Sequence, residues 1–238
     1  MQSVLRLLYP PQCIGCGNLV EQDFALCGAC WRETPFVTGL ACDSCGVPLP
    51  GDASERPEHC DDCLTIARPW QRGRAALVYR DKARRLVLGL KHGDRLDLIR
   101  PAGRWLAGIA PPLMQDDTVI VPIPAHWLRL LRRRYNQAAL LAVELSRQLK
   151  HPVIPDLLKR SRPTKVQDGM SRNQRFANMT GAIEPSITAE RRLAGRSVLL
   201  VDDVMTSGAT LAVATDACHR AGASSVNILV LARVAKDT

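Results

Sequence analysis

The sequence predicts an α/β protein in which helices cover both faces of a parallel β-sheet, with a small cysteine-rich module before it. Strand-like and helical runs alternate from residue 74 onward, and the strand-like runs are apolar throughout, which is typical of strands buried on both faces. Eight of the nine cysteines precede residue 64. Because this asymmetry marks two modules and the pattern breaks near Pro69, we expect two domains, residues 1–68 and residues 69–238.

The first module contains four Cys-x-x-Cys pairs, and we predict that they hold two structural zinc ions. Ten residues separate the first two pairs and fourteen separate the last two. Four thiolates suit tetrahedral zinc, and a closed shell of cysteines is structural rather than catalytic. A segment this short and turn-rich needs such staples, since it cannot bury enough surface to fold by packing alone. The predicted ligands are Cys13, Cys16, Cys27 and Cys30 for one site and Cys42, Cys45, Cys60 and Cys63 for the other.

We predict sequential pairing, in which the first two Cys-x-x-Cys pairs share one metal and the last two share the other. Two alternatives stay open. In a cross-braced arrangement the first and third pairs share one metal, because ligand spacing constrains topology only loosely. A redox or iron–sulfur role is the second alternative. Metal binding is favoured over disulfides because the cytosol keeps thiols reduced.

The second module supplies the strands and helices of the predicted sheet. Strands are expected at 74–79, 118–122, 197–201 and 225–232, with a weaker one at 153–159, and helices at 82–91, 97–109, 136–150 and 210–221. The strand segments are short apolar runs, whereas 136–150 has the amphipathic spacing of a helix. Pro111 and Pro112 end the helix that precedes them. Residues 160–180 are polar and basic, so we predict a long mobile loop there.

The charge of the chain changes sign between the two modules. Residues 1–71 carry 4 Lys and Arg against 9 Asp and Glu, whereas residues 72–238 carry 28 against 14. Residues 126–178 hold 12 Lys and Arg and 3 Asp and Glu, and such a basic patch favours phosphates, nucleic acid or an anionic membrane surface. We assign Arg129, Arg132 and Arg133 to a nucleic-acid patch. A solvated basic face and a direct contact with a bound ligand are the alternatives.

The decisive motif is the run Val198-Leu-Leu-Val-Asp-Asp-Val-Met-Thr-Ser-Gly-Ala-Thr210. Its apolar half predicts a buried strand, and we expect Asp202 and Asp203 to emerge where that strand ends. Adjacent carboxylates can accept hydrogen bonds from the hydroxyls of a ribose, with Mg²⁺ sharing the oxygen-rich neighbourhood. The hydroxyl-rich turn that follows opens a helix, where free N–H groups and the helix dipole favour an anion such as a 5′-phosphate. The predicted phosphate-binding residues are Val204, Met205, Thr206, Ser207, Gly208, Ala209 and Thr210.

Two other interpretations of this run compete with a ribose-phosphate site. A lone Asp-Asp pair can simply end a strand while Thr206 caps a helix, but the whole run exceeds what that requires. The aspartate-bearing strand of a P-loop ATPase is the other interpretation, and no Gly-x-x-x-x-Gly-Lys-Ser/Thr motif occurs in the chain. A ribose 5-phosphate cradle therefore fits the run best.

The run resembles the phosphoribosyl-pyrophosphate motif of type I phosphoribosyltransferases, and the chain as a whole resembles the ComF/GntX competence-protein family. Beside the cysteine pairs and the Asp-Asp run, the resemblance rests on Val121-Pro-Ile-Pro124, Arg134-Tyr-Asn-Gln-Ala138 and Arg162-Pro-Thr-Lys-Val-Gln167. These motifs occur in the family's order. The resemblance implies a type I phosphoribosyltransferase fold that binds 5-phosphoribosyl-1-pyrophosphate (PRPP) together with Mg²⁺.

The resemblance also implies roles for individual residues. The segment from Pro122 to Arg134 takes the place of the loop that grips pyrophosphate, and residues 160–178 resemble the flexible loop that closes over the reacting centre. Lys91 resembles a position near the substrate, with a plain surface lysine as the alternative. The catalytic residues would be Asp202, Asp203 and Lys165. The other loop residues would be Pro122, Ile123, Pro124, Arg134, Asn136, Gln137, Arg162, Gln167, Arg172 and Arg175.

Three functions are compatible with these features. The resemblance implies a protein of DNA uptake, natural transformation or use of external DNA, with the basic patch binding single-stranded DNA, although aromatic residues for base stacking are scarce there. The second is an active transferase that displaces pyrophosphate from PRPP. The third is a PRPP-sensing regulator whose acidic zinc module docks a partner such as a DNA-uptake helicase or another competence protein. We favour DNA handling over nucleotide salvage.

We expect a cytoplasmic protein that is not an integral membrane protein. No stretch approaches the 18 or more apolar residues of a membrane span, and the first ten residues are too short and wrongly charged for a secretory signal. Peripheral contact with the inner face of the membrane is compatible with the basic charge.

Overall fold

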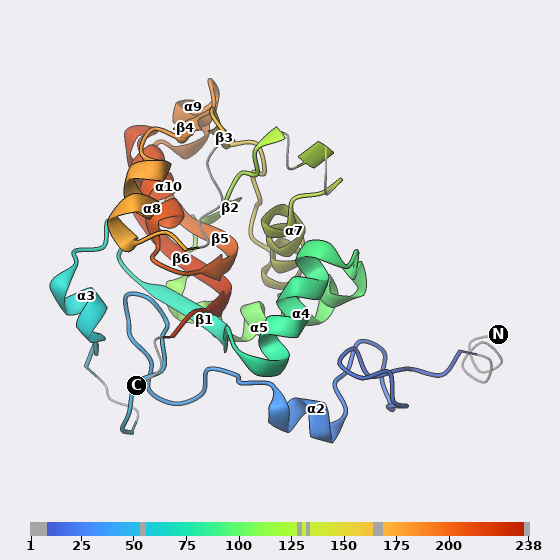
Figure 1. The fold of residues 1–238 in the computed structure, drawn as a ribbon. Coiled ribbons are helices and arrows are strands. Elements are labelled where there is room, and N and C mark those ends of the chain that lie inside the picture. The colour runs from blue at the N-terminus through green and yellow to red at the C-terminus, as the bar shows by residue number, and fades with distance from the viewer. Residues whose placement is uncertain (1–8, 53–55, 128–129, 132–133, 164–168, 236–238) are drawn as a thin grey trace.

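The computed structural model describes residues 9–52, 56–127, 130–131, 134–163 and 169–235, and its centre is a four-stranded parallel sheet (Figure 1). The strand order is β1-β6-β5-β2. The strands are β1 (Gly73–Val78), β2 (Val119–Pro122), β5 (Ser197–Met205) and β6 (Ser225–Arg233). Each neighbouring pair runs parallel. The predicted α/β architecture is therefore confirmed.

Helices cover both faces of this sheet because its central strands are apolar on both. In β5, Val198 and Leu200 pack into one core cluster while Leu199 and Val201 pack into the other, since successive side chains point to opposite faces. One face is covered by α4 (Asp81–His92), α5 (Ile99–Ile109) and α7 (Gln137–Leu149), with short 3-10 turns at Leu96–Leu98 and Pro111–Leu113. The other is covered by α10 (Ala209–Arg220) (Figure 1). No helix among the described residues has the length and apolar character needed to cross a membrane.

The segment after α7 differs from the strand expected at residues 153–159. Val153 forms a single bridge with Ile120 at the edge of the sheet. Further along, β3 (Leu158–Arg160) pairs antiparallel with β4 (Ile183–Pro185) and forms a small sheet of its own. A short helix, α9 (Ala189–Leu193), follows β4. The small sheet packs on the α10 side of the main sheet, where Leu158 and Ile183 join the same core cluster.

The long loop predicted for 160–180 is wrong over its second half, where α8 (Arg172–Met179) forms. Ser171 accepts the N–H of Gln174, and the Gln174 side chain accepts the N–H of Ser171 in return. This capping box satisfies two donors at the helix start, which explains a helix in a polar sequence. Residues 164–168 lie outside the described residues.

The cysteine-rich module lies along the edge strand β1 and contains the short helices α2 (Gly28–Glu33) and α3 (Asp61–Thr65) (Figure 1). Phe36, in the chain between the two halves of the module, forms an antiparallel bridge with Leu77 of β1. The N–H of Val37 donates to the carbonyl of Ala76 at 2.9 Å. Backbone hydrogen bonds therefore join this module to the outer edge of the sheet.

Candidate functional site

The two adjacent aspartates lie inside a strand rather than beyond its end. β5 continues to Met205 because the long strand β6 offers a partner along its length, with Val230 opposite Asp202 and Ala232 opposite Val204. The expectation that the aspartates emerge where the strand ends is therefore wrong. Successive side chains of a strand point to opposite faces, so the two carboxylates have different surroundings.

Lys91, near the end of α4, pairs with Asp203. Lys91 Nζ lies 3.0 Å from Asp203 Oδ1, and the two side chains are 21% and 14% exposed. The end of α4 is held in turn by Tyr135, whose hydroxyl donates to Leu90 O at 3.1 Å, and by Gln137, whose side chain reaches Lys91 O at 3.5 Å. The structure therefore places Lys91 against the acidic pair instead of on a free surface.

Asp202 has a different electrostatic environment. Burial, and then the neighbouring charge of Asp203, raise the pKa of the Asp202 carboxyl to about 7 against the opposing charge of Lys91. Its Oδ1 accepts the backbone N–H of Asp203 at 2.8 Å. A raised pKa favours the protonated form, so the Asp202 carboxyl is able to donate a hydrogen bond to a hydroxyl as well as accept one.

The turn at residues 206–208 has carbonyls that are bound by arginines, whereas its N–H groups are free among the described residues. Arg233 Nη1 donates to the carbonyls of residues 205 and 206 at 3.2 and 2.6 Å, and Arg68 Nη1 donates to that of residue 207 at 2.9 Å. Gly208 has a φ of 84°, which favours glycine, and α10 begins at the next residue. Within the described part of the chain, the N–H groups of residues 206–208 have no acceptor. The start of α10 therefore offers free donors to an anion.

The predicted pyrophosphate loop begins beside the acidic pair. Pro122, at the end of β2, lies opposite Val201 of β5. The N–H of Ile123 donates to Val201 O at 2.9 Å, and Asn136 Nδ2 donates to Ile123 O at 2.9 Å. Asn136 also caps α7 by accepting the N–H of Ala138 at 3.1 Å. Asn136 therefore connects the start of this loop to the helix that follows it, and Pro124 in the same loop is buried.

None of the three residues assigned to the nucleic-acid patch can be placed. Arg129, Arg132 and Arg133 lie outside the described residues, whereas Arg134 is exposed. Nearby, Trp127 is 59% exposed and Leu131 is 72% exposed. An exposed aromatic ring is a surface on which a nucleobase can stack.

The described arginines of the predicted flexible loop bind carbonyls of their own segment. Arg162 Nη2 donates to two carbonyls at and after the end of α8, at 3.1 and 2.7 Å, and Arg175 Nε donates to the carbonyl of residue 170 at 3.1 Å. Lys165 and Gln167 lie outside the described residues, and only the backbone of Arg172 is described. In this conformation Arg162 and Arg175 stabilise the loop itself. Their approach to pyrophosphate stays a prediction.

The eight cysteines of the first module form two foursomes in sequential pairing. The first foursome is Cys13, Cys16, Cys27 and Cys30, and the second foursome is Cys42, Cys45, Cys60 and Cys63, with the sulfurs of each within 4.8 Å of one another. Cys16 Sγ lies 3.7 Å from Cys27 Sγ, and Cys45 Sγ lies 3.6 Å from Cys60 Sγ. Four sulfurs at about 2.3 Å from a tetrahedral zinc lie about 3.8 Å apart, so both foursomes fit that ion. The cross-braced alternative is wrong.

Two basic residues outside the cysteine motifs donate to sulfurs of the foursomes. Lys82 Nζ of α4 lies 3.3 Å from Cys30 Sγ, and Arg68 Nε lies 3.4 Å from Cys63 Sγ. Donors of this kind orient the ligands of a metal and stabilise their charge. Neither residue was predicted, because a single basic residue outside a motif has no spacing signal.

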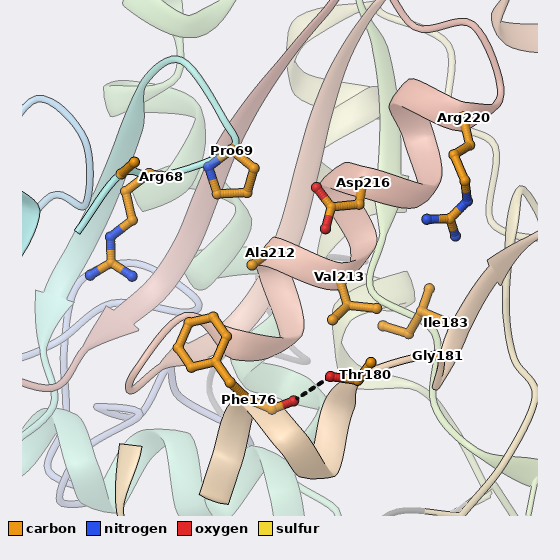
Figure 2. A pocket seen from close by; sticks show the side chains of 11 residues that line it. Arg68, Pro69, Phe176, Thr180, Gly181, Ile183, Ala212, Val213, Asp216 and Arg220 are labelled. Carbon is orange, nitrogen blue, oxygen red and sulfur yellow. Dashed lines mark hydrogen bonds between the residues drawn. The ribbon is translucent and has the colours of Figure 1, made fainter. Parts of the chain in front are cut away.

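A hollow of about 530 Å³ lies on the flank of α10 (Figure 2). Arg68 and Pro69 line it from the segment between the two modules. The residues that line it from the other side are Phe176, Thr180, Gly181 and Ile183, and those from α10 are Ala212, Val213, Asp216 and Arg220. None of the predicted ligand-binding residues lines this hollow. The hollow is therefore distinct from the turn at residues 206–208.

Known protein families match both modules. A double zinc ribbon domain family matches residues 4–64, and a phosphoribosyl transferase domain family matches residues 136–238. Together with the parallel sheet and the two cysteine foursomes, these matches define a double zinc-ribbon protein with a type I phosphoribosyltransferase fold.

Proteins of similar sequence span most of the chain. Competence protein F of Haemophilus influenzae is 29% identical over 231 residues, which cover 93% of this chain and 96% of that protein. DNA utilization protein YhgH of Escherichia coli K12 is 31% identical over 216 residues, 88% of this chain and 91% of that protein. Competence protein ComFC of Bacillus subtilis is 26% identical over 223 residues, 90% of this chain and 87% of that protein. The chain belongs to the ComF/GntX competence-protein family.

Proposed function

We propose that this protein binds the phosphoribosyl group of PRPP and acts in the uptake or use of external DNA. The observation that carries the ligand assignment is the turn at residues 206–208, whose carbonyls are bound by arginines while its N–H groups are free at the start of α10. A 5′-phosphate would satisfy those donors. The hydroxyls of Thr206, Ser207 and Thr210 would add further donors.

The acidic pair supports a ribose next to that phosphate. Asp203, held by Lys91, offers an acceptor for a ribose hydroxyl, and Asp202, with a pKa raised to about 7, is able to accept or donate a proton there. Carboxylate oxygens are also the ligands that Mg²⁺ prefers. Asp202 and Asp203 are the residues that would hold this ion, which when bound would neutralise charge on the pyrophosphate.

The names of the relatives and the surface of the second module support a role with DNA. The three relatives are named for competence or for DNA utilization. Trp127 and Leu131 are exposed within the basic segment, so a single strand would find both phosphate contacts and a stacking surface there. A DNA-uptake helicase or another competence protein is the partner we propose for the acidic zinc module.

Turnover of PRPP is the second candidate, and the contact between Lys91 and Asp203 favours it. In that reaction a nitrogen nucleophile displaces pyrophosphate, the carboxylates orient the ribose, and cationic side chains stabilise the leaving group. Release of pyrophosphate that depends on one particular nucleobase would rank this candidate above DNA handling.

Calorimetric titration with PRPP and Mg²⁺ tests the ligand. We expect wild-type protein to bind below millimolar PRPP, and Asp203→Asn to bind about 10–100-fold more weakly because it loses a charge-assisted contact. Asp97→Asn is the matched control, since it breaks an exposed pair with Arg95. Absence of binding at millimolar PRPP would overturn the ligand assignment.

Fluorescence anisotropy with labelled single-stranded DNA tests the second half of the proposal. Affinity should fall steeply with added salt, because counterions are released from the phosphates on binding. Trp127→Ala should weaken binding, whereas Asp203→Asn should leave it unchanged. Binding that is absent, or that does not respond to salt, would contradict a direct role with DNA.

A further inference from the structure

One arginine connects the second cysteine foursome to the turn at residues 206–208. Arg68 donates from Nε to Cys63 Sγ at 3.4 Å and from Nη1 to Ser207 O at 2.9 Å, so a single guanidinium contacts both. Its third nitrogen, Nη2, is buried and has no hydrogen-bond partner among the residues that the structure describes. A guanidinium held in this way requires a nearby negative charge, and zinc-bound thiolates are the group that would provide it.

A second arginine binds the same turn from a neighbouring position. Arg233 is 4% exposed and donates to the carbonyls of Met205 and Thr206. Three successive carbonyls, those of residues 205–207, are therefore bound by two arginines, and one of these, Arg68, also contacts the second foursome.

The turn also packs directly against side chains next to that foursome. Trp70 is 3% exposed, and its Nε1 donates to the carbonyl of Ser44 at 2.6 Å, next to Cys45. A Cβ placed on Gly208 would lie 3.0 Å from the Trp70 ring and 3.0 Å from Arg68 Nη1. Glycine at position 208 therefore allows the turn to rest on Trp70 and Arg68 without a gap.

The first foursome is attached to a different part of the second module. Lys82 of α4 donates to Cys30 Sγ at 3.3 Å and pairs with Glu33 at 3.0 Å. Arg95, in the turn after α4, donates to the carbonyl of Ile14 at 3.0 Å. These contacts connect the first foursome to α4 and its following turn, and not to residues 206–208.

We propose that the second zinc ribbon stabilises the conformation of the turn at residues 206–208, and that Arg68 is the positioning residue between them. This inference rests on the proposed binding of a phosphoribosyl ligand at that turn. Cys63 Sγ, fixed within a zinc shell, orients the Arg68 guanidinium, which holds the Ser207 carbonyl away from the incoming anion. Loss of the metal would release this sulfur, because the binding energy of a structural zinc ion is also the folding energy of its site.

The coupling is reciprocal. If zinc in the second foursome raises the affinity of the turn for its ligand, the ligand raises the zinc affinity of that foursome by the same factor. The occupancy of a metal site in one module therefore regulates ligand binding in the other. The first foursome contacts α4 and the turn that follows it, not residues 206–208, so we expect it to contribute less to this coupling.

Calorimetry with PRPP and Mg²⁺ on full-length variants tests the role of Arg68. We expect Arg68→Met to bind about 5–150-fold more weakly, the usual range of coupling between sites. Arg68→Lys should fall between this variant and wild type, because one ammonium group contacts the sulfur or the carbonyl but does not reach both. Lys82→Met, the matched control at the first foursome, should change the affinity by less than about twofold. Zinc content and thermal unfolding are measured on each variant, so that a folding defect is recognised.

A second measurement needs no variant of Arg68. Zinc release from wild-type protein to a chromogenic chelator is followed with and without PRPP, and we expect PRPP to slow the release of one zinc equivalent of the two. Cys16→Ser removes an exposed ligand of the first foursome and should leave the PRPP-sensitive phase intact. If Arg68→Met loses zinc or unfolds, the comparison of zinc release with and without PRPP tests the inference by itself.

The outcomes separate this inference from the proposed function on which it rests. Full PRPP affinity in folded Arg68→Met, or zinc release that PRPP does not slow in protein that binds PRPP, would overturn the inference. Wild-type protein that binds no PRPP would overturn the ligand assignment instead.

Discussion

The two cysteine foursomes have the same ligands but different surroundings. In the first foursome, Cys16 is exposed, and the contacts from the second module come from α4 and the turn after it. In the second, Cys42 and Cys45 are fully buried and belong to the core cluster that also contains Trp70 and the inner face of α10. Two foursomes with the same ligands therefore have different neighbours, because one lies against α4 and the other lies inside the main core.

Removal of one zinc ligand should give the largest difference in stability between the two foursomes. We expect Cys45→Ser to lose one zinc equivalent and to cost more than about 4 kcal/mol, which corresponds to a Tm lower by about 10 °C, because the site lies inside the main core. Cys16→Ser should lose one equivalent at less than half that cost. Zinc content and differential scanning calorimetry measure both effects. Equal destabilisation by the two variants would remove the contrast between the foursomes.

The tryptophans beside the two foursomes provide the next comparison. Trp70 is 3% exposed beneath Gly208, whereas Trp31 is 53% exposed and stacks on Phe36 with ring centroids 4.4 Å apart. Trp70→Ala should cost about 3–5 kcal/mol by opening a cavity, and Trp31→Ala about 1 kcal/mol. Urea denaturation measures both. A larger loss of unfolding free energy for Trp31→Ala would mean that the surroundings of the first foursome, not the second, contribute more to stability.

The ion pairs of Asp43 predict a dependence of stability on pH. Asp43 of the second ribbon lies 2.9 Å from Arg72 and 2.6 Å from Arg74. Burial pushes the pKa of its carboxyl upward, but hydrogen bonds from the two arginines outweigh burial and leave the pKa below its usual value. A lowered folded pKa gives stability that is present above the unfolded pKa and is lost as pH falls through the folded pKa.

We therefore expect Asp43→Asn to cost about 1–3 kcal/mol at neutral pH, and the difference from wild type to shrink as pH falls below about 4. Chemical denaturation over a series of pH values measures this difference. A cost that stays constant through this acid range would show that Asp43 stabilises the interface by packing rather than by charge.

The corresponding ion pair of the first ribbon should contribute least. Glu33 is paired with Lys82 at 3.0 Å, but its side chain is 63% exposed. Glu33→Gln should change the free energy of unfolding by less than about 0.5 kcal/mol, and added salt should reduce the effect further. Denaturation at low and high ionic strength measures it. A cost comparable with that of Asp43→Asn would mean that both ribbons are attached by equally strong ion pairs.

The architecture could be predicted because its signals are local. The apolar run at 197–201 and the amphipathic spacing of 136–150 each identify an element from a few neighbouring residues, and the spacing of the cysteine pairs identifies two metal sites. The extension of β5 to Met205 was missed because it depends on the partner strand β6, which the local sequence of β5 does not describe. The helix α8 was missed although its capping box was visible in Ser171 and Gln174.

The candidate site was predictable to a smaller extent. A phosphate-binding turn is predicted by the motif, because a glycine and hydroxyl side chains at the start of a helix favour an anion. The contacts that hold this turn in place come from Arg68 and Arg233, which lie outside the motif and meet it through the tertiary fold. No pattern of spacing in a single sequence records such contacts.

The bridge between Phe36 and Leu77 has a consequence for dividing this protein into fragments. β1 is the outer strand of the sheet, and an open strand edge is a template for pairing with another chain. Residues 35–37 occupy this edge: the N–H of Val78 donates to Pro35 O at 2.8 Å, and the N–H of Val37 donates to Ala76 O at 2.9 Å. A fragment that begins at residue 69 would lose this cover and expose the strand to a second copy of itself. We therefore expect the zinc module also to protect its neighbour from aggregation, so that the two modules are best produced together.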